Sequence, residues 1–283
     1  MTKLSVTTIS FNQAAFLERT IQSVLGQEGM EIEYIVLDPG STDGSRDIIE
    51  RYRAQISIVD YSPDAGPADG LNKGLARATG EFFCYVNSDD VLLPGAVEAF
   101  SRALRNHPDT DVIYGNGLFI DEADRVLRPA VSAQYFNAWL YVHGLATIVQ
   151  QASFIRTSSL RRAGGFNLAN KTCWDGEAFL KIALDGGRFR RVWGDWGGFR
   201  IHGGSITGTG RLKALFEADI ERMFRETQGR DRTAADRAVA AAAKALLRLW
   251  DWRRRPGSAT ALLSQLRHRL SEPAHIGEGG KGG

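Results

Sequence analysis

The chain has 283 residues, of which 43% are apolar and 24% charged, and its formal net charge is +2. A chain of this length can bury a sizeable core, either as one large domain or as a domain with an appendage. Acidic and basic residues nearly balance, so we expect no nucleic acid or other global polyelectrolyte partner.

The N-terminal residues enter a strand pattern at once, without the apolar core of a signal peptide. No uncharged apolar stretch approaches the roughly 18 residues that a membrane-spanning helix needs. Cys84 and Cys173 lie far apart in sequence, which fits neither a zinc motif nor a disulfide framework and suits a reducing compartment. These features predict a cytoplasmic protein.

The first 120 residues alternate strand-like and helix-like patterns. Apolar runs predict strands over residues 3–10, 33–38 and 56–60 and in the run that starts at Glu81. Amphipathic stripes predict helices at Leu17, Ile21, Val24 and Leu25, at Ile48, Ile49 and Tyr52, at Leu71, Leu75 and Ala78, and over residues 91–104. This alternation is typical of an α/β fold, in which a parallel sheet is covered on both faces.

Three of the predicted strand ends are rich in Asp, Ser and Gly. They are residues 38–44, 60–69 and 87–90. In parallel α/β sheets, ligands bind beyond the carboxyl ends of the strands. We therefore expect these three segments to converge on one crevice.

After about residue 125 the pattern loosens. Residues 175–185 predict a helix, residues 186–210 predict short strands separated by Gly-rich turns, and the chain from Arg211 onward predicts helices. The final residues, 273–283, have the composition of a disordered tail.

Asp89 and Asp90 are adjacent at the end of the fourth predicted strand, where two carboxylates repel each other unless a cation lies nearby. One interpretation is that they cap the following helix. The other is a divalent cation shared with a phosphorylated ligand, because Mg²⁺ and Mn²⁺ are held by carboxylates and phosphate oxygens. Asp38 and Asp64 add acids at neighbouring strand ends and favour the metal.

Two glycine motifs for nucleotide binding are absent. A dinucleotide fold has G-x-G-x-x-G after the first strand, where this chain has "SFNQAAF", and no G-x-x-x-x-G-K-[ST] loop occurs. The sequence therefore predicts a diphosphate held by a metal and not by a glycine-rich loop.

Several blocks carry a resemblance to a known family. The blocks "LSVTTISFNQAAFLERTIQSVLGQ", "EYIVLDPGSTDGS", "DAGPADGLNKGLARATGEFF" and "YVNSDDVLLPGA" resemble the nucleotide-sugar domain of family 2 glycosyltransferases, inverting enzymes of GT-A fold. The blocks "GGFN…CWDGEAFLKIA" and "FRIHGGSIT" resemble that family's acceptor half, so the resemblance covers residues 3–207. It implies a Rossmann-like, mixed but mainly parallel sheet flanked by helices.

The resemblance also implies how the chain is divided. We expect a nucleotide-sugar-binding half over residues 1–120 and an acceptor-binding half over residues 121–210. A C-terminal helical extension would follow over residues 211–272, and then the tail over 273–283.

The resemblance implies a donor site at the strand ends, made by Thr8, Ser10, Asp38, Lys73, Asn87, Ser88 and Asp89. Asp38 corresponds to the residue that accepts the imino proton of uracil or a similar base. Asn87 replaces the first aspartate of the family's D-x-D element and can still bond to ribose hydroxyls. Lys73, or Arg77 one helical turn further on, would meet phosphate, although a solvated helix face explains either residue at least as well.

The implied cofactor is Mn²⁺ or Mg²⁺, with Asp89 as its ligand. His202 resembles the downstream histidine that some GT-A enzymes use as a further ligand, and Asp90 is a second candidate. A structural histidine with satisfied hydrogen bonds is nearly as good an interpretation of His202.

The implied general base is Asp175, and Glu177 is the alternative. Asp175 could also cap the helix, which is compatible with catalysis. Trp174 and Trp196 offer flat faces for acceptor sugars, although tryptophans more often pack in a core.

The resulting hypothesis is an inverting transferase that moves one sugar from a nucleotide diphosphate sugar, with UDP favoured, to a glycan or lipid-linked glycan. The alternatives are a non-catalytic subunit that binds nucleotide sugars and a sugar-nucleotide pyrophosphorylase. Basic and apolar faces of the C-terminal helices suit a peripheral contact with an anionic membrane, and a partner helix or domain packing explains them equally well.

Overall fold

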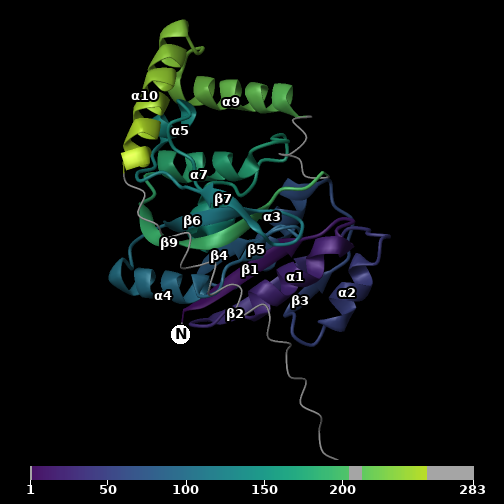
Figure 1. The fold of residues 1–283 in the computed structure, drawn as a ribbon. Helices are drawn as coiled ribbons and strands as arrows, with labels where there is room; N and C mark the ends of the chain where they lie inside the picture. Colours follow the sequence, from purple (N-terminus) through teal and green to yellow (C-terminus); the bar gives the residue numbers. More distant parts are fainter. Residues whose placement is uncertain (1, 204–211, 254–283) are drawn as a thin grey trace, which may run out of the picture. The chain divides into compact units, whose positions relative to one another are not determined.

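The computed structural model describes residues 2–203 and 212–253 (Figure 1). The chain divides into two compact units, Met1–Arg237 and Ala238–Gly283. All the strands described below belong to the first unit. The predicted boundaries at residues 120 and 210 separate functional halves and stay a prediction, and the predicted tail over 273–283 lies outside the described residues.

A mixed sheet with the order β3-β2-β1-β4-β8-β6-β9-β5 forms the centre of the first unit, and β7 pairs with β6. The strands are β1 (Lys3–Ile9), β2 (Glu31–Leu37), β3 (Ile58–Asp60), β4 (Phe82–Tyr85), β5 (Val91–Leu92), β6 (Val112–Ile120), β7 (Val126–Ala130), β8 (Ser153–Arg156) and β9 (Phe189–Arg200). The helices of this unit are α1 (Ala14–Leu25), α2 (Ser45–Arg51), α3 (Pro67–Arg77), α4 (Ala96–Asn106), α5 (Ala138–Val142), α6 (Thr157–Arg162), α7 (Trp174–Leu184) and α9 (Lys213–Gln228), with a short 3-10 helix, η1 (Gln150–Ala152).

The first half of the sheet is parallel. β1 pairs in parallel with β2 and β4, and β2 pairs in parallel with β3. Their carboxyl ends therefore lie at one edge of the sheet. β8 enters antiparallel between β4 and β6, whereas β6 and β9 are parallel. The α/β class with a mixed sheet between helices is confirmed.

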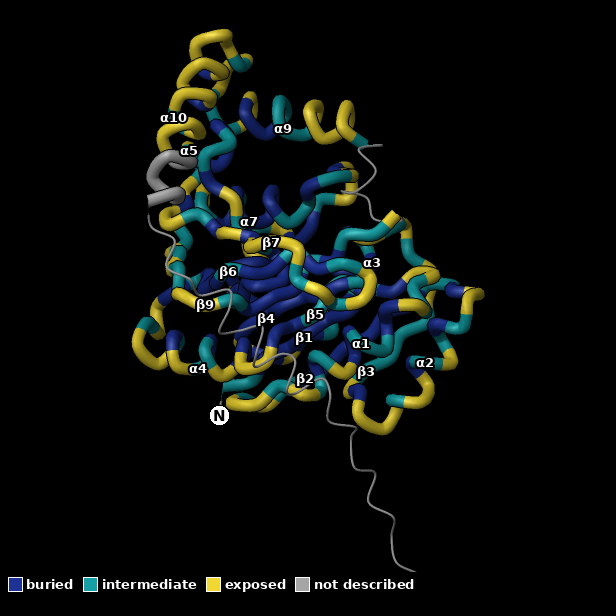
Figure 2. The backbone as a smooth tube through the Cα atoms, viewed as in Figure 1, coloured by how far each residue is buried: buried dark blue, intermediate teal, exposed yellow. Residues whose placement is uncertain are grey.

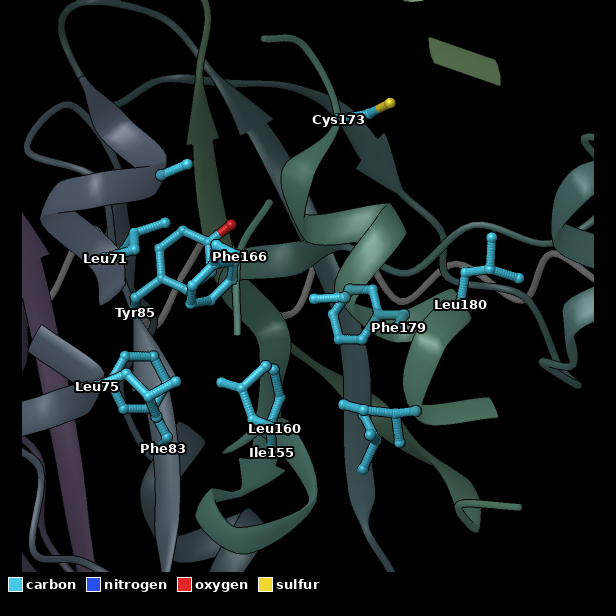
Figure 3. Packing of buried hydrophobic residues seen from close by; sticks show 14 of the residues in the cluster. Leu71, Leu75, Phe83, Tyr85, Ile155, Leu160, Phe166, Cys173, Phe179 and Leu180 are labelled. Atoms are coloured by element: carbon cyan, nitrogen blue, oxygen red, sulfur yellow. The ribbon is translucent and has the colours of Figure 1, made fainter. Parts of the chain in front are cut away.

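Two hydrophobic clusters cover the two faces of the sheet. Successive residues of β4 point to opposite faces, because side chains alternate along a strand. Phe82 packs in the cluster beneath α1 and α4, and Phe83 packs in the cluster beneath α3 and α7. Figure 3 shows the second cluster, with Leu75 of α3 beside Phe83 and Leu71 of α3 beside Tyr85, and Figure 2 shows the buried strands between the helices.

Two sequence predictions about local structure are wrong. Residues 91–104 do not form one helix, because Val91 and Leu92 form β5 against β9 and α4 begins only at Ala96. Residues 186–210 were expected to form short strands, but within the described part of that range, 186–203, β9 is one strand of 12 residues. Its glycines allow close packing and do not mark turns: an added Cβ on Gly197 would lie 2.7 Å from Gln151.

The predicted helical character after Arg211 is confirmed for the described residues. α9 covers Lys213–Gln228, and α10 (Ala234–Arg253) begins in the first unit and continues into the second. None of the described helices is long and apolar enough to cross a bilayer.

Candidate active site

A cavity of about 980 Å³ opens at the carboxyl ends of the parallel strands. The predicted convergence of three strand ends is confirmed, because Pro39, Asp64 and Asp89 each line this cavity from a different one of the predicted segments. The predicted site residues that line it are Ser10, Asn87, Ser88, Asp89, Asp90, Trp174 and Asp175. The cavity thus brings residues from the first and second halves of the sequence to one place.

The adjacent acids Asp89 and Asp90 differ in their surroundings. Asp90 is buried, and its carboxylate accepts hydrogen bonds from Gln151 Nε2 at 2.6 Å, the Arg200 N–H at 2.8 Å and Asn87 Nδ2 at 3.3 Å. Burial, and secondly the charge of Asp89, raise the pKa of Asp90 to about 8. Asp90 therefore anchors the turn after β4. Neither acid caps α4, since Gly95 occupies the N-cap position of that helix.

Asp89 keeps 20% of its side chain exposed and lies 3.0 Å from His202, measured between Oδ2 and Nε2. The His202 ring packs against Phe16 with centroids 4.6 Å apart. Arg200 is buried beside this pair, but its Nε donates to the backbone carbonyl of Asp89 at 2.7 Å and leaves the carboxylate accessible. The positive charge of Arg200 therefore lies next to the Asp89 carboxylate without occupying the space in front of it. We call Asp89 and Asp90 the acidic corner.

The Asp89–His202 pair supplies two potential metal ligands. Within residues 2–203 and 212–253, no group of three or more His, Cys, Asp or Glu side chains is arranged to hold a metal ion. Mg²⁺ is commonly bound through one or two carboxylates together with substrate phosphates. One carboxylate and one imidazole therefore fit Mn²⁺ or Mg²⁺ if phosphate oxygens of a donor complete the coordination.

At the end of β2, Asp38 is fully buried. Its Oδ1 accepts hydrogen bonds from the N–H groups of Gly40 and Ser41 and from Arg46 Nε. Its Oδ2 and the hydroxyl of Ser10 are also buried, and neither has a hydrogen-bond partner among the described residues. Since buried polar atoms are normally paired, these two atoms mark places where a ligand could bond.

Three predicted donor residues lie outside the cavity lining: the buried Asp38, and also Thr8 and Lys73. Thr8 is buried with its hydroxyl 3.0 Å from the hydroxyl of Tyr34. Lys73 Nζ bonds to the Pro63 carbonyl and lies 3.7 Å from Asp69. The structure brings neither the Thr8 nor the Lys73 side chain to the place where a diphosphate could lie.

Asp175 lies in the first turn of α7, one residue after the helix begins, and is not its N-cap. Its carboxyl is partly exposed to the cavity, but the surrounding protein still desolvates it. Burial raises its pKa above the ordinary value, against the opposing hydrogen bond from the Gly176 N–H. The charge of Asp175 also raises the pKa of the nearby Tyr85 and Tyr141, behind burial as the main cause.

Glu177, the alternative base, is buried and does not line the cavity. Its carboxylate accepts hydrogen bonds at 2.7 Å from both Asn167 and Asn170, forms an ion pair with Arg222 at 2.5 Å, and lies 3.2 Å from Lys181. Burial alone would raise the pKa of Glu177, but these partners lower it to about 2. Glu177 is placed to hold the 167–177 segment against α9.

The two candidate acceptor tryptophans are in different environments. Trp174 is half-buried and lines the cavity. Trp196 is only 2% exposed and packs against Phe154 in the core, so its ring offers no face to a sugar and this prediction is corrected. Phe119 and Arg128 also line the cavity but were not predicted, because no motif marks them and only the strand register brings them there.

Comparison with known proteins agrees with this geometry. The model of the family described as "Glycosyl transferase family 2" matches residues 5–161. The chain belongs to this family. An uncharacterised glycosyltransferase of Nostoc sp. is 29% identical over 245 residues, covering 77% of this chain and 72% of that protein. An uncharacterised glycosyltransferase of Mycobacterium tuberculosis is 31% identical over 184 residues, covering 64% of this chain and 69% of that protein.

The chain also matches proteins that have more specific descriptions. A Campylobacter jejuni protein described as a GalNAc(5)-diNAcBac-PP-undecaprenol β-1,3-glucosyltransferase is 34% identical over 106 residues, covering 36% of this chain and 34% of that protein. The crystal structure of Staphylococcus aureus TarS 1–349 matches with a TM-score of 0.64 and 19% identity, covering 85% of this chain and 70% of TarS. A mannosyltransferase of Pyrobaculum calidifontis matches with a TM-score of 0.58 and 16% identity, covering 94% of this chain and 80% of the mannosyltransferase. These structural matches establish the GT-A fold.

Proposed function

We propose that this family 2 glycosyltransferase is an inverting enzyme that transfers one sugar from a UDP-sugar to a hydroxyl of a glycan or lipid-linked glycan. The observation that carries the proposal is the single cavity that Asp89, Asn87 and Ser10 line from the donor side and Asp175 lines from α7. A reaction between a phosphorylated donor and an acceptor hydroxyl needs both kinds of group at one place.

Inverting transfer is an in-line displacement. The acceptor oxygen forms a bond to the anomeric carbon while the bond from that carbon to the diphosphate oxygen breaks, and the hydroxyl proton moves to a base. We assign the base to Asp175, because it faces the cavity and its raised pKa brings it closer to the operating pH. A positioned general base contributes about 10²- to 10⁴-fold to such a step.

Asp89 and His202 would hold the divalent ion together with the donor diphosphate. The ion, when bound, supplies electrostatic stabilisation of the negative charge on the leaving diphosphate. Asp90 keeps Asp89 in place through its hydrogen bonds to Gln151 and the Arg200 N–H. Asn87 lies beside them and would bond to ribose hydroxyls.

The proposed uracil contact is at Asp38. Its buried Oδ2 has no partner within the described part of the chain and can accept the imino N–H of uracil. TarS 1–349 has been crystallised with UDP-GlcNAc and with UDP, whereas the Pyrobaculum mannosyltransferase has been crystallised with GDP-Man and Mn²⁺. An acidic hydrogen-bond acceptor suits uracil and guanine alike, so the nucleotide is tested directly.

Calorimetric titration with UDP and GDP, each with and without Mn²⁺, tests the donor site. We expect UDP to bind in a manner that depends on Mn²⁺, and Asp89→Asn to lose that dependence. Asp109→Asn is the matched control, because Asp109 is an exposed acid remote from the cavity lining. Absence of UDP binding to the native protein with Mn²⁺ would refute the proposed donor.

A panel of nucleotide sugars, screened for release of the nucleoside diphosphate, would identify the donor sugar. Slow release in the absence of acceptor would argue against a non-catalytic subunit. Release of pyrophosphate from UTP in the presence of a sugar 1-phosphate would instead favour a pyrophosphorylase.

A further inference from the structure

Part of the cavity lining consists of three side chains in one row across three strands. Arg128 of β7 is directly opposite Phe119 of β6, which is directly opposite Phe199 of β9. Residues directly opposite in neighbouring strands point to the same face of a sheet. All three side chains line the cavity, and we call them the Arg128 row.

The members of the Arg128 row contact one another. The Arg128 guanidinium carbon lies 3.6 Å from the centroid of the Phe119 ring, and the rings of Phe119 and Phe199 meet edge-to-face at 5.4 Å. Stacking on an aromatic ring orients a guanidinium and leaves its N–H groups free at the edge of the plane. The row therefore presents a positioned cation on an apolar surface, next to Val131, which is 47% exposed.

Arg128 is the one Lys or Arg among the residues that line the cavity, as far as the described part of the chain shows. Its guanidinium has no hydrogen bond or ion pair to any residue in 2–203 or 212–253. The same lining contains four aspartates: Asp64, Asp89, Asp90 and Asp175. An unpaired arginine at a cavity that contains four aspartates is placed to bind an anion there.

We propose that the Arg128 row is an acceptor subsite, and that it selects acceptors carrying an oxyanion beside an apolar or sugar-ring face. This inference rests on the proposed function, since it assigns the second substrate of the same cavity. The shared chemistry is an oxyanion, which can be the phosphate of a lipid carrier or the carboxylate of an acidic sugar. Arginine binds both in a bidentate manner.

Binding of three small probes tests the subsite directly, measured by ligand-observed NMR with UDP and Mn²⁺ present. The probes are octyl phosphate, methyl β-glucuronide and the uncharged octyl β-glucoside. We expect at least one of the two anions to bind about tenfold more tightly than octyl glucoside, and Arg128→Gln to abolish that preference. Octyl phosphate alone would indicate a lipid-phosphate acceptor, and the glucuronide alone an acidic glycan.

Arg125→Gln is the matched control. Arg125 lies near the tip of the same hairpin and is highly exposed, but it pairs with Asp121 at 2.7 Å and does not line the cavity. This variant should keep the native preference for the anion, and Arg128→Lys should keep part of it. Equal binding of charged and uncharged probes by the native protein would overturn the proposal.

The affinity for UDP separates this proposal from the proposed function. Arg128→Gln should leave UDP binding unchanged. A drop in UDP affinity with no change in anion preference would assign Arg128 to the donor and overturn the acceptor subsite. Failure of the native protein to bind UDP would instead refute the proposed function, while the probes measured without UDP would still report on the row.

Discussion

Asp175 and Glu177 are two carboxylic acids in the first turn of α7, and they have opposite environments. Asp175 faces the cavity, and burial raises its pKa. Glu177 points to the protein interior, where Asn167, Asn170 and Arg222 lower its pKa to about 2. Residues two apart on a helix do not share a face, so one turn can serve both purposes.

The difference shows how a helix terminus can hold the proposed general base firmly. Glu177 stays ionised and ties α7 to the 167–170 loop and to α9, and this arrangement fixes the backbone on which Asp175 sits. Asp175 keeps few partners and is left able to take a proton. Carboxylates whose environments move their pKa values apart commonly have different roles.

Asp175→Asn should have the largest effect on activity. The amide cannot accept the acceptor proton, so we expect turnover to fall by about 10²- to 10⁴-fold. UDP affinity should be unchanged, and stability at pH 7 should not fall, because the raised pKa means that the ionised carboxyl destabilises the folded state. Diphosphate-release kinetics and thermal unfolding measure these quantities, and normal turnover would refute the assignment of the base.

Arg222→Ala should have the largest effect on stability. It removes the ion pair with the buried Glu177, and we expect a loss of about 2–3 kcal/mol in the free energy of unfolding. Arg225→Ala is the matched control, since Arg225 lies on the same helix and its ion pair within the described residues is with the exposed Asp231. Urea denaturation compares the two, and equal stability would show that the Glu177 network does not hold α7.

Lowering the pH should separate the two acids. Asp175 takes up a proton at a higher pH than an ordinary aspartate, so kcat/KM should fall while the fold is intact. Glu177 has a folded pKa of about 2 against its ordinary 4.5, so its stabilisation is complete above pH 4.5 and is lost as the pH falls toward 2. A pH–rate profile and thermal unfolding on the same samples test the order, and simultaneous loss would contradict it.

The smallest effect is expected at the other end of α7. Asp185 is 50% exposed and pairs with Arg162, which is 56% exposed. Asp185→Asn should change stability by less than about 0.5 kcal/mol and leave turnover unchanged, because exposed ion pairs contribute little. This variant is also the control for Asp175→Asn, and a clear loss of turnover would show that any charge change on α7 disturbs the site.

Sequence patterns predicted the parts of the fold that depend on local periodicity. Phe82 and Phe83 point to opposite faces of a buried parallel strand, and the acids after it lie at the cavity, as the alternation of strands and helices indicated. The short strand at Val91 and Leu92 was missed, because its only strand partner lies about 105 residues later in β9. No local pattern encodes such a pairing.

Sequence patterns also predicted part of the candidate site and missed the rest. The sequence identified both Asp89 and His202, which lie 3.0 Å apart. It could not show that Trp196 is buried in the core, since a tryptophan in a Gly-rich segment fits a surface site equally well. It also missed Arg128, whose position depends on the register between β6 and β7.

Arg200 links the acidic corner to the hairpin that carries Arg128. Its Nε bonds to the carbonyl of Asp89, its Nη1 bonds to the carbonyl of Asp121 at 2.7 Å, and its Nη2 lies 2.5 Å from Asp124. An engineer who wants a new acceptor preference would exchange this hairpin between homologues. The chimera should retain the native tip, residues 121–124, and replace only the strands around it, or the surroundings of Asp89 will be altered along with the specificity.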